Sequence, residues 1–404
     1  MKVACVGGGP ASLYLSILLK LRDPGHEVAV HERRPAGSTY GWGVTYWPDM
    51  LEDLARCDEP SARAIEEASV RWSGGVAHTA AGTVTHDGDV GYAVGRHRLL
   101  DILAERADSL GVRLEFGSEV RATADLSGTA DLVVAGDGAH SQLRDRIAGR
   151  FGTRRAEGGN RYIWLGTSKV FTAFTFAFVE TPHGWIWCYG YGFGDEGSTF
   201  IVECSAATWT GLGLDRMPES ESFPMLQNLF AKPLDGHELT GRPEIGGRTQ
   251  WRTFSTVTNE TWYDGNLVLI GDAAHTTHYS IGAGTTLAMR DAMCLARTLH
   301  DPARGDLPAA LAAYSHERRR ALLSSQSAAR HSARWYESLP RYMALDPQQM
   351  FSLLGQRHSP LLPYLPPKLY YRLDQAVGRA EPLRRLKQRA GSRLASTLQT
   401  LHRS

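Results

Sequence analysis

The sequence predicts an α/β fold, with a Rossmann-like parallel sheet that begins at the N-terminus and an antiparallel sheet in the middle of the chain. Three observations predict it. A strand, a glycine-rich turn and a helix follow one another at residues 2–21. A second buried strand at residues 266–270 also runs into a glycine-rich segment, and alternating aromatic and β-branched runs fill residues 159–204.

The first thirty-odd residues are predicted to form a βαβ unit. Residues 2–6 read as a short buried strand, and residues 11–21 have the length and spacing of a helix. Residues 26–32 read as the second strand. It ends in Glu32, followed by Arg33, where an acidic side chain would accept the ribose hydroxyls of an adenosine.

The turn of this unit is the segment Gly7-Gly8-Gly9-Pro10-Ala11-Ser12. Gly7 and Gly9 let the backbone turn tightly and approach a pyrophosphate, which then lies on the helix N-terminus. Ser12 replaces the third glycine of the usual motif and is still small enough for close helix–strand packing. A glycine turn that binds nothing is the alternative. It is disfavoured because strand, turn, helix and acid fall together.

Two later strands also end in nucleotide-binding signals. Residues 131–135 read as a buried strand that delivers Asp137-Gly138, and residues 266–270 deliver Gly271-Asp272. Ligands of α/β sheets bind at the carboxyl ends of the strands, and Asp272 is suited to a chain of sugar-like hydroxyls.

The glycine-rich residues 282–286 begin a helix predicted over residues 287–299. The free N–H groups and positive dipole end of such a helix suit the N1–C2=O edge of a reduced, anionic flavin. Two signatures this far apart indicate one long cofactor held at both ends, and FAD is the candidate. A plain strand–loop–helix turn at 271–286 is the alternative.

The middle third predicts an antiparallel meander. Residues 159–169, 174–178, 185–193 and 198–204 alternate aromatic and β-branched side chains between turn residues. Side chains that repeat at period two are more often core than pocket, so about half of these aromatic residues are expected to pack between the sheet and the nucleotide-binding part.

Composition excludes several classes of protein. The chain has 404 residues, which suggests two to three domains, and 44 basic against 43 acidic side chains argue against bulk nucleic-acid binding. No apolar stretch reaches the roughly 18 residues of a membrane span, and the apolar run to Leu21 is interrupted by glycines and a proline, unlike a signal peptide. The five cysteines lack a CxxC pair, so we expect free thiols, no metal site and a cytoplasmic protein.

The three nucleotide signatures, in this order, resemble those of the class A flavoprotein aromatic monooxygenases of the para-hydroxybenzoate hydroxylase type. The resemblance implies an FAD domain built from discontinuous segments and an inserted substrate domain with an antiparallel sheet. The expected division is FAD-binding residues 1–70, 92–158 and 264–335, substrate-binding residues 71–91 and 159–263, and a helical C-terminal region 336–404 with a basic tail.

The resemblance also implies roles for single residues. Arg96, at the start of a predicted helix, would contact the FAD pyrophosphate, Asp272 the ribityl chain, and Asp137 the dinucleotide sites. Gly284-Thr285-Thr286 would contact the isoalloxazine ring. The full set of expected cofactor-binding residues is Gly7, Gly9, Pro10, Ala11, Ser12, Glu32, Arg33, Arg96, Asp137, Asp272, Gly282, Gly284, Thr285 and Thr286.

One segment indicates a branch of that family. His278-Tyr279-Ser280-Ile281-Gly282 stands where the family usually has a proline stretch. Together with Trp-Leu-Gly-Thr-Ser-Lys, Phe-Thr-Phe-Ala-Phe and Ser-Thr-Phe-Ile-Val-Glu, it is similar to the salicylyl-CoA 5-hydroxylases, the 2-aminobenzoyl-CoA monooxygenases and the tryptophan hydroxylases of violacein synthesis. His278 and Tyr279 are therefore expected to face the substrate as catalytic groups. A loop-fixing hydrogen bond is the alternative for His278.

By this resemblance NAD(P)H reduces FAD, O2 is the co-substrate, and a C4a-hydroperoxyflavin hydroxylates an activated ring. An aryl-CoA thioester is favoured as substrate, with salicylyl-CoA converted to gentisyl-CoA. The alternatives are a hydroxylase of a free aromatic amino acid or indole, an NAD-dependent dehydrogenase, and a non-catalytic flavin-binding relative.

The C-terminal region is basic and interrupted by prolines. Residues 377–404 hold seven basic side chains against Glu381, which indicates a solvated tail, with CoA-phosphate binding or a dimer contact as alternatives. Residues 359–367 are rich in proline and apolar residues, and are expected to be a packed arm or a stiff linker. The protein is expected to be a monomer or a homodimer.

Overall fold

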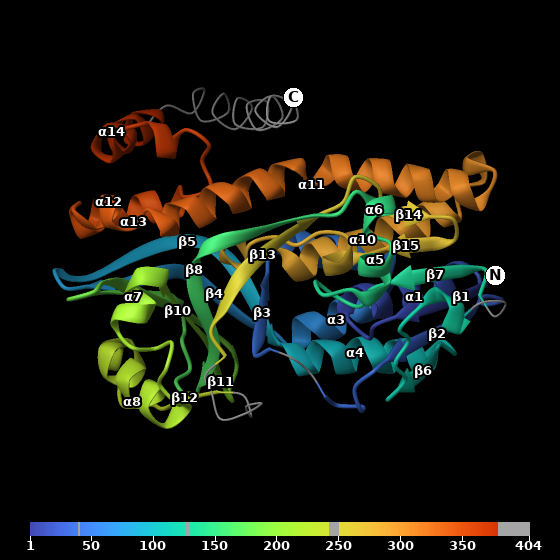
Figure 1. The fold of residues 1–404 in the computed structure, drawn as a ribbon, viewed down its shortest axis with the longest axis horizontal. Helices are drawn as coiled ribbons and strands as arrows, with labels where there is room; N and C mark the ends of the chain where they lie inside the picture. The colour runs from blue at the N-terminus through green and yellow to red at the C-terminus, as the bar shows by residue number, and fades with distance from the viewer. Residues whose placement is uncertain (39–40, 127–129, 242–249, 379–404) are drawn as a thin grey trace.

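The computed structural model describes residues 1–38, 41–126, 130–241 and 250–378 (Figure 1). Two sheets organise these residues: a six-stranded sheet near the N-terminus and a nine-stranded sheet beside it. Helices pack on both, so the predicted α/β class is confirmed.

The six-stranded sheet carries the predicted βαβ unit. Its strand order is β14-β15-β7-β1-β2-β6, parallel throughout except for the β14–β15 pair. The predicted strands and the structure agree to within one or two residues. The strands are β1 Lys2–Val6, β2 Glu27–Glu32, β6 Arg113–Phe116, β7 Leu132–Ala135, β14 Tyr263–Asp264 and β15 Leu267–Leu269.

Three long helices cover this sheet. α1 (Pro10–Arg22) packs against α4 (Arg96–Ser109) and α10 (Gly284–Leu299). The helices predicted after the two glycine-rich segments are confirmed, and α10 begins at Gly284, three residues before the predicted start at residue 287. Shorter helices complete this part of the molecule: α2 Pro48–Cys57, α3 Glu59–Glu67, α5 Gln142–Arg146 and α6 Ala148–Phe151.

The nine-stranded sheet contains the predicted meander. Its order is β12-β8-β11-β10-β9-β4-β5-β3, with β13 paired to β8, and only the β4–β9 pair is parallel. β3 lies within residues 1–70, so this part of the chain contributes to both sheets. The strands are β3 Gly43–Tyr46, β4 Val70–Thr79, β5 Gly82–Gly95, β8 Arg154–Thr167, β9 Phe174–Thr181, β10 Gly184–Gly194, β11 Gly197–Ser205, β12 Leu239–Thr240 and β13 Arg252–Thr258.

The two faces of this sheet pack against different partners because side chains alternate along each strand. On β10, Ile186 and Cys188 join a core with α8 and its neighbours, whereas Trp187 and Tyr189 join an aromatic cluster on the opposite face. The helices near the first face are α7 Ala206–Gly211, α8 Glu219–Leu229 and α9 Ala231–Leu234.

The long helix α11 (Leu307–Glu337) runs along the molecule and links its two halves (Figure 1). It packs against α10 and against β8. Beyond it lie α12 Pro340–Met343, α13 Pro347–Gly355 and α14 Pro367–Gly378. The proline-rich arm is packed through Leu362, which is 1% exposed. The basic tail predicted to bind phosphates or a second subunit lies outside the described residues, apart from its first two positions.

Among the residues that the structure describes, no helix is both long enough and apolar enough to cross a membrane.

Candidate active site

Two adjoining cavities follow the ends of the parallel strands. The smaller, about 250 Å³, lies beside Gly7 and Glu32, and the larger, about 1380 Å³, extends past Asp272 to Thr285. The two share lining residues, so an elongated ligand has a continuous path from one to the other. The shared residues are Gly9, Arg33, Arg34, Arg96, Gly136, Asp137, Gly138 and His140.

The glycine loop after β1 is shaped by a close backbone approach. Gly7 has φ +97°, and a Cβ there would lie 2.5 Å from the Gly136 carbonyl oxygen. Gly9 caps α1 without a side-chain hydrogen bond. The first-turn N–H groups of α1 are therefore left to an anionic ligand.

Glu32 holds the glycine loop as well as facing the smaller cavity. Its Oε2 accepts a hydrogen bond from the Gly8 backbone N–H at 2.8 Å, and its Oε1 accepts one from the Arg34 backbone N–H at 2.9 Å. Each carboxylate oxygen has two acceptor sites, so Glu32 can fix the loop and still accept a ribose hydroxyl.

Ser12 has the packing role expected of the small third position. It is fully buried, and a Cβ at Gly136 would lie 2.1 Å from its Oγ. Ser12 therefore sets the distance between α1 and the loop after β7, and it does not line either cavity.

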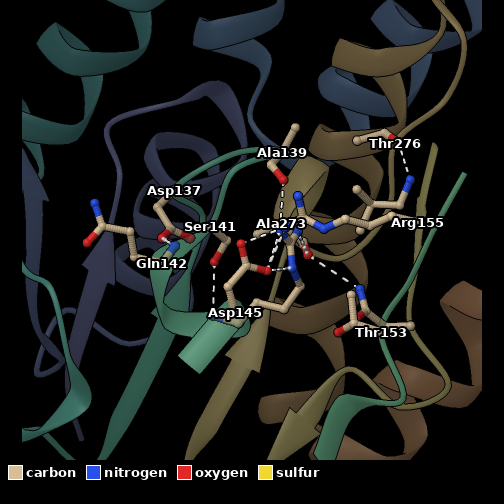
Figure 2. A network of polar contacts seen from close by, with 12 residues as sticks. Asp137, Ala139, Ser141, Gln142, Asp145, Thr153, Arg155, Ala273 and Thr276 are labelled. Atoms are coloured by element: carbon tan, nitrogen blue, oxygen red, sulfur yellow. Dashed lines mark hydrogen bonds and ion pairs between the residues drawn. The ribbon is translucent and has the colours of Figure 1, made fainter. Parts of the chain in front are cut away.

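Asp137 lies on the strip between the two cavities, and Figure 2 shows its side chain next to Gln142. Its Oδ2 accepts a hydrogen bond from the Gln142 backbone N–H at 2.8 Å. Its buried Oδ1 has no hydrogen-bond partner among the described residues, and burial raises the pKa of this carboxyl. Oδ1 is thus available to a ligand hydroxyl or N–H group.

A buried arginine joins the loop after β7 to the loop after β15. Arg144 is fully buried and donates to the Ala139 carbonyl at 2.8 Å and the Ala273 carbonyl at 3.0 Å. It also pairs with Asp145 at 2.9 Å, and Figure 2 shows Ala139, Asp145 and Ala273 lying close together. Arg144 therefore fixes the spacing of the two acidic motifs.

Asp272 points into the larger cavity. Its side chain is accessible from that cavity, which is open to solvent on one side. Burial raises the pKa of its carboxyl, and the nearby charges of His275 and Arg96 partly offset this. An acidic acceptor in such a place suits ligand hydroxyls, as expected for the ribityl chain.

The turn that carries Asp272 is fixed by Asp291 of α10, which the sequence reasoning missed. Asp291 is fully buried and accepts hydrogen bonds from the Gly271 backbone N–H at 3.0 Å and from His275 Nε2 at 2.8 Å. Arg318 of α11 pairs with its other oxygen at 2.7 Å. Desolvation opposes ionisation, but these partners lower the pKa of Asp291 below its ordinary value.

His278 forms part of a network that holds the loop before α10. Its Nδ1 lies 2.8 Å from Ser280 Oγ, which lies 2.7 Å from Ser332 Oγ of α11. Arg357 donates to the Ser280 carbonyl at 2.8 Å. Burial, with a smaller effect of Arg357, lowers the pKa of His278 to about 3, so its ring is neutral at physiological pH.

Tyr279 lines the larger cavity directly. Its ring centroid lies 4.5 Å from that of Tyr162 on β8, and 6.3 Å from that of Tyr189 on β10. The loop then turns at Gly282, which has φ +62°, and Gly284 begins α10 with no side-chain cap at its N-terminus. Its N–H groups are open to a ligand edge.

The opposite wall of the larger cavity is aromatic. The aromatic residues of β8 to β10 were predicted to be more often core than pocket, and those that face the cavity are both: they pack in one cluster and line the cavity. Alternation at period two was the available signal, but it does not say which face of the sheet meets a cavity. The Trp, Tyr and Phe residues that line the larger cavity are Trp47, Trp72, Tyr162, Trp164, Phe174, Phe176, Tyr189, Tyr191, Phe254, Tyr279, Tyr336 and Phe351.

Most of the predicted site residues line one or both cavities. Three do not: Ser12 packs against Gly136, His278 bonds to Ser280, and Thr286 donates to Met50 Sδ at 3.2 Å. Those that line them are Gly7, Gly9, Pro10, Ala11, Glu32, Arg33, Arg96, Asp137, Asp272, Tyr279, Gly282, Gly284 and Thr285.

Comparison with known proteins agrees with this geometry. A family model described as an FAD binding domain matches residues 1–325. Salicyloyl-CoA 5-hydroxylase from a Streptomyces species is 38% identical over 352 residues, which are 85% of this chain and 66% of that relative. The chain thus spans just under two thirds of that relative.

Two further comparisons extend along most of both partners. A 3-hydroxy-4-methyl-anthranilyl-(aryl-carrier protein) 5-monooxygenase from Streptosporangium sibiricum is 35% identical over 84% of this chain and 90% of that protein. The solved structure of 2-methyl-3-hydroxypyridine-5-carboxylic acid oxygenase matches with a TM-score of 0.65 at 19% identity, covering 89% of this chain and 96% of that one. At this identity the structural likeness establishes the fold.

Cavities that join a glycine loop, a buried acid and an uncapped helix N-terminus match the chemistry of FAD, and the family comparison agrees. The chain belongs to the FAD binding domain family and is an FAD-dependent aromatic monooxygenase.

Proposed function

We propose that this monooxygenase hydroxylates an aryl-CoA thioester, with salicylyl-CoA as the substrate and gentisyl-CoA as the product. The observation that carries the proposal is the likeness to two enzymes whose printed names specify aryl groups joined to CoA or to an aryl-carrier protein. The aromatic wall of the larger cavity suits the flat ring of such a substrate.

The strip of shared lining residues, with the adjoining part of each cavity, is the proposed FAD site. Gly7 and Gly9 with the N-terminus of α1 would hold the pyrophosphate, with Arg96 nearby, and Glu32 the ribose. Arg33 and Asp137 would lie along the dinucleotide, and Asp272 would accept hydrogen bonds from the ribityl chain. When bound, FAD supplies the redox chemistry, with NAD(P)H as reductant and O2 as co-substrate.

At the inner end of the FAD site, Gly284 and Thr285 would present N–H groups to the flavin ring. Gly282, whose own N–H donates to the Tyr279 carbonyl at 2.9 Å, would line the turn beside them. Thr286 does not line the cavity and its hydroxyl donates to Met50, so only its backbone would be available to the ring. Tyr279 is the polar side chain proposed to contact the substrate, and it would form a hydrogen bond with the hydroxyl or amine of the substrate ring. His278 is better supported as the group that fixes this loop, since it is neutral and bonded to Ser280.

The protein's part in the reaction is to hold the ring, to exclude water and to manage the proton of the ring substituent. The aromatic wall supplies the first two by burying the ring beside the glycine loop. The Tyr189 hydroxyl, buried without a hydrogen-bond partner among the described residues, is a second group available to the substrate.

The test is a substrate panel with the purified holoenzyme. Salicylyl-CoA is expected to perturb the bound flavin spectrum, to stimulate NAD(P)H oxidation and to give gentisyl-CoA by mass spectrometry. Failure of both salicylyl-CoA and 2-aminobenzoyl-CoA to perturb the flavin would reject the thioester proposal. Turnover of tryptophan or a related indole would favour the alternative of a free aromatic substrate. Binding of a panel compound without turnover would favour a non-catalytic flavin-binding relative.

The relative that acts on a carrier-protein substrate supports a second candidate. Its likeness covers 90% of that enzyme, so a hydroxyanthranilyl group on a carrier protein belongs in the panel. A carrier-bound aryl group that is hydroxylated faster than its CoA ester would favour this candidate.

A further inference from the structure

Glu203 is a buried acid whose place the proposed roles do not explain. It lies on β11, is 1% exposed, and stands on the same face of the sheet as the cavity-lining Ile201, two positions earlier. Its direct cross-strand partners are Trp187 on β10 and Tyr162 on β8. A lone carboxyl in such a setting is costly to bury unless it is used or well bonded.

The hydrogen bonds of Glu203 leave one oxygen available. Oε1 accepts from Asn160 Nδ2 at 2.7 Å, whereas the buried Oε2 has no hydrogen-bond partner among the described residues. Trp187 is the cross-strand neighbour of Glu203 on β10, and Tyr162, its neighbour on β8, packs its ring against Tyr279 with centroids 4.5 Å apart. Tyr279 and Glu203 also shift each other's pKa. Glu203 therefore lies directly behind Tyr279, the residue that faces the cavity.

The surroundings of the Glu203 carboxyl allow it to change protonation state near neutral pH. Burial raises the pKa of Glu203 to about 7, with Asn160 and Tyr279 lowering it and Glu337 of α11 raising it. Burial also raises the pKa of Tyr279 far above its ordinary value, so its phenol stays protonated at rest. The other titratable groups around the pair are His278, whose ring centroid lies 4.2 Å from that of Tyr279, and Tyr162, Tyr189, Cys204, Tyr336 and Arg357.

We infer that Glu203 and Tyr279 form a proton-holding pair, in which Tyr279 passes the proton of the substrate's ring hydroxyl to the Glu203 carboxylate. The inference deepens the proposed function and assumes a ring that carries a hydroxyl. The substrate O–H bond breaks as an O–H bond forms on Tyr279, while the original Tyr279 proton moves to Glu203. No electrons are transferred, and the net charge of the three groups is unchanged.

This proton transfer leaves the substrate ring activated as a phenolate whose charge is not exposed to solvent. A phenolate is a far better donor of electron density than a phenol, and the buried carboxyl keeps the removed proton close by. Glu203 acts on the substrate only through Tyr279, so it is a positioning residue for the proton. Loss of activity in a Glu203 variant would therefore not be a sufficient test of its role.

The first measurement titrates the carboxyl in the holoenzyme without substrate. Infrared difference spectra of the wild-type enzyme minus Glu203→Gln should show one protonated carboxyl band with a midpoint near pH 7. Asn160→Ala should move that midpoint upward, because Asn160 stabilises the carboxylate. Absence of a band that titrates near neutral pH would overturn the inference, whatever the substrate proves to be.

The second measurement follows the ionisation of bound salicylyl-CoA by its phenolate absorbance. In the wild-type enzyme the phenolate should dominate at pH 7.5, and both Glu203→Gln and Tyr279→Phe should shift its midpoint upward. In both variants turnover should fall by about 100-fold, and the pH profile of turnover should lose its inflection near pH 7. Glu180→Gln, an exposed acid on β9, is the matched control and should behave as wild type.

The outcomes separate the two proposals. If salicylyl-CoA does not bind the wild-type enzyme but the Glu203 band titrates, the substrate proposal fails and the proton-holding pair stands. If salicylyl-CoA binds as a phenolate in Glu203→Gln and the pH profile of turnover is unchanged, the pair is rejected and the substrate proposal stands.

Discussion

The carboxylate of Asp291 accepts a hydrogen bond from the backbone N–H of Gly271 at 3.0 Å. This bond joins α10 to the turn after β15, so the helix that should meet the flavin ring also fixes the turn that carries Asp272. The same carboxylate is bonded to His275 and Arg318. One buried acid thus sets the geometry of the whole inner end of the cofactor site.

Asp291→Asn is expected to destabilise this region strongly. It leaves Arg318 buried without its counter-ion, a change that typically costs about 3–5 kcal/mol. Thermal unfolding of the holoenzyme should begin at a lower temperature, and flavin should be released more easily. Asp264→Asn, which breaks a half-exposed pair with Arg150, is the control and should cost less than about 1 kcal/mol. Equal effects of the two substitutions would contradict the role given to Asp291.

Gly7→Ala is expected to lower FAD affinity by at least about tenfold, or about 1.4 kcal/mol. The new Cβ would lie 2.5 Å from the Gly136 carbonyl oxygen at φ +97°, so the glycine loop must move. Fluorescence titration of the apoprotein with FAD measures the change. Gly111→Ala, at φ +80° with no atom nearby, imposes backbone strain without a clash, and its FAD affinity should be unchanged.

His278 is expected to act through its loop. Asn can replace the acceptor Nδ1 that faces Ser280, so His278→Asn should keep most of the activity, whereas His278→Ala should loosen the loop and reduce turnover. Steady-state kinetics with NAD(P)H oxidation as readout separates them. Equal losses in both variants would instead indicate that the imidazole itself transfers a proton.

The same histidine predicts a stability change in acid. Its folded-state pKa is about 3, below the ordinary value of 6.5, so the unfolded chain binds more protons between these values. The wild-type protein should therefore lose stability as the pH falls from about 6.5 toward 3. Denaturant unfolding of His278→Asn should show less of this loss.

Glu203 predicts the opposite trend. Its pKa is raised from 4.5 to about 7, so the folded state binds more protons in this range and stability falls as the pH rises through it. Above pH 7 the cost of the buried carboxylate is about 3 kcal/mol at 1.36 kcal/mol per pKa unit. Glu203→Gln should be more stable than wild type there and similar to it near pH 4.5. Denaturant unfolding across this range should show the gap widen with pH.

The nucleotide-binding part was predictable because its signals are local. A strand followed by glycines and a helix dictates both the turn and the place of an anionic ligand, so Gly7, Gly9 and the strand before Gly271 could be placed in advance. The start of α4 at Arg96 was equally local. The residues that hold these motifs in place, Arg144 and Asp291, gave no comparable signal, since each acts on a turn distant from it in the chain.

The sequence by itself determined the α/β class, the glycine turns, the meander and the resemblance to FAD-dependent aromatic monooxygenases. Only the tertiary structure decided which side chains reach the cavity: Tyr279 lines it, His278 and Thr286 turn to other partners, and Glu203 lies behind Tyr279. The reason is physical. Backbone conformation follows from neighbouring residues, whereas the face that meets a cavity, and the burial that shifts a pKa, depend on segments packed from elsewhere in the chain.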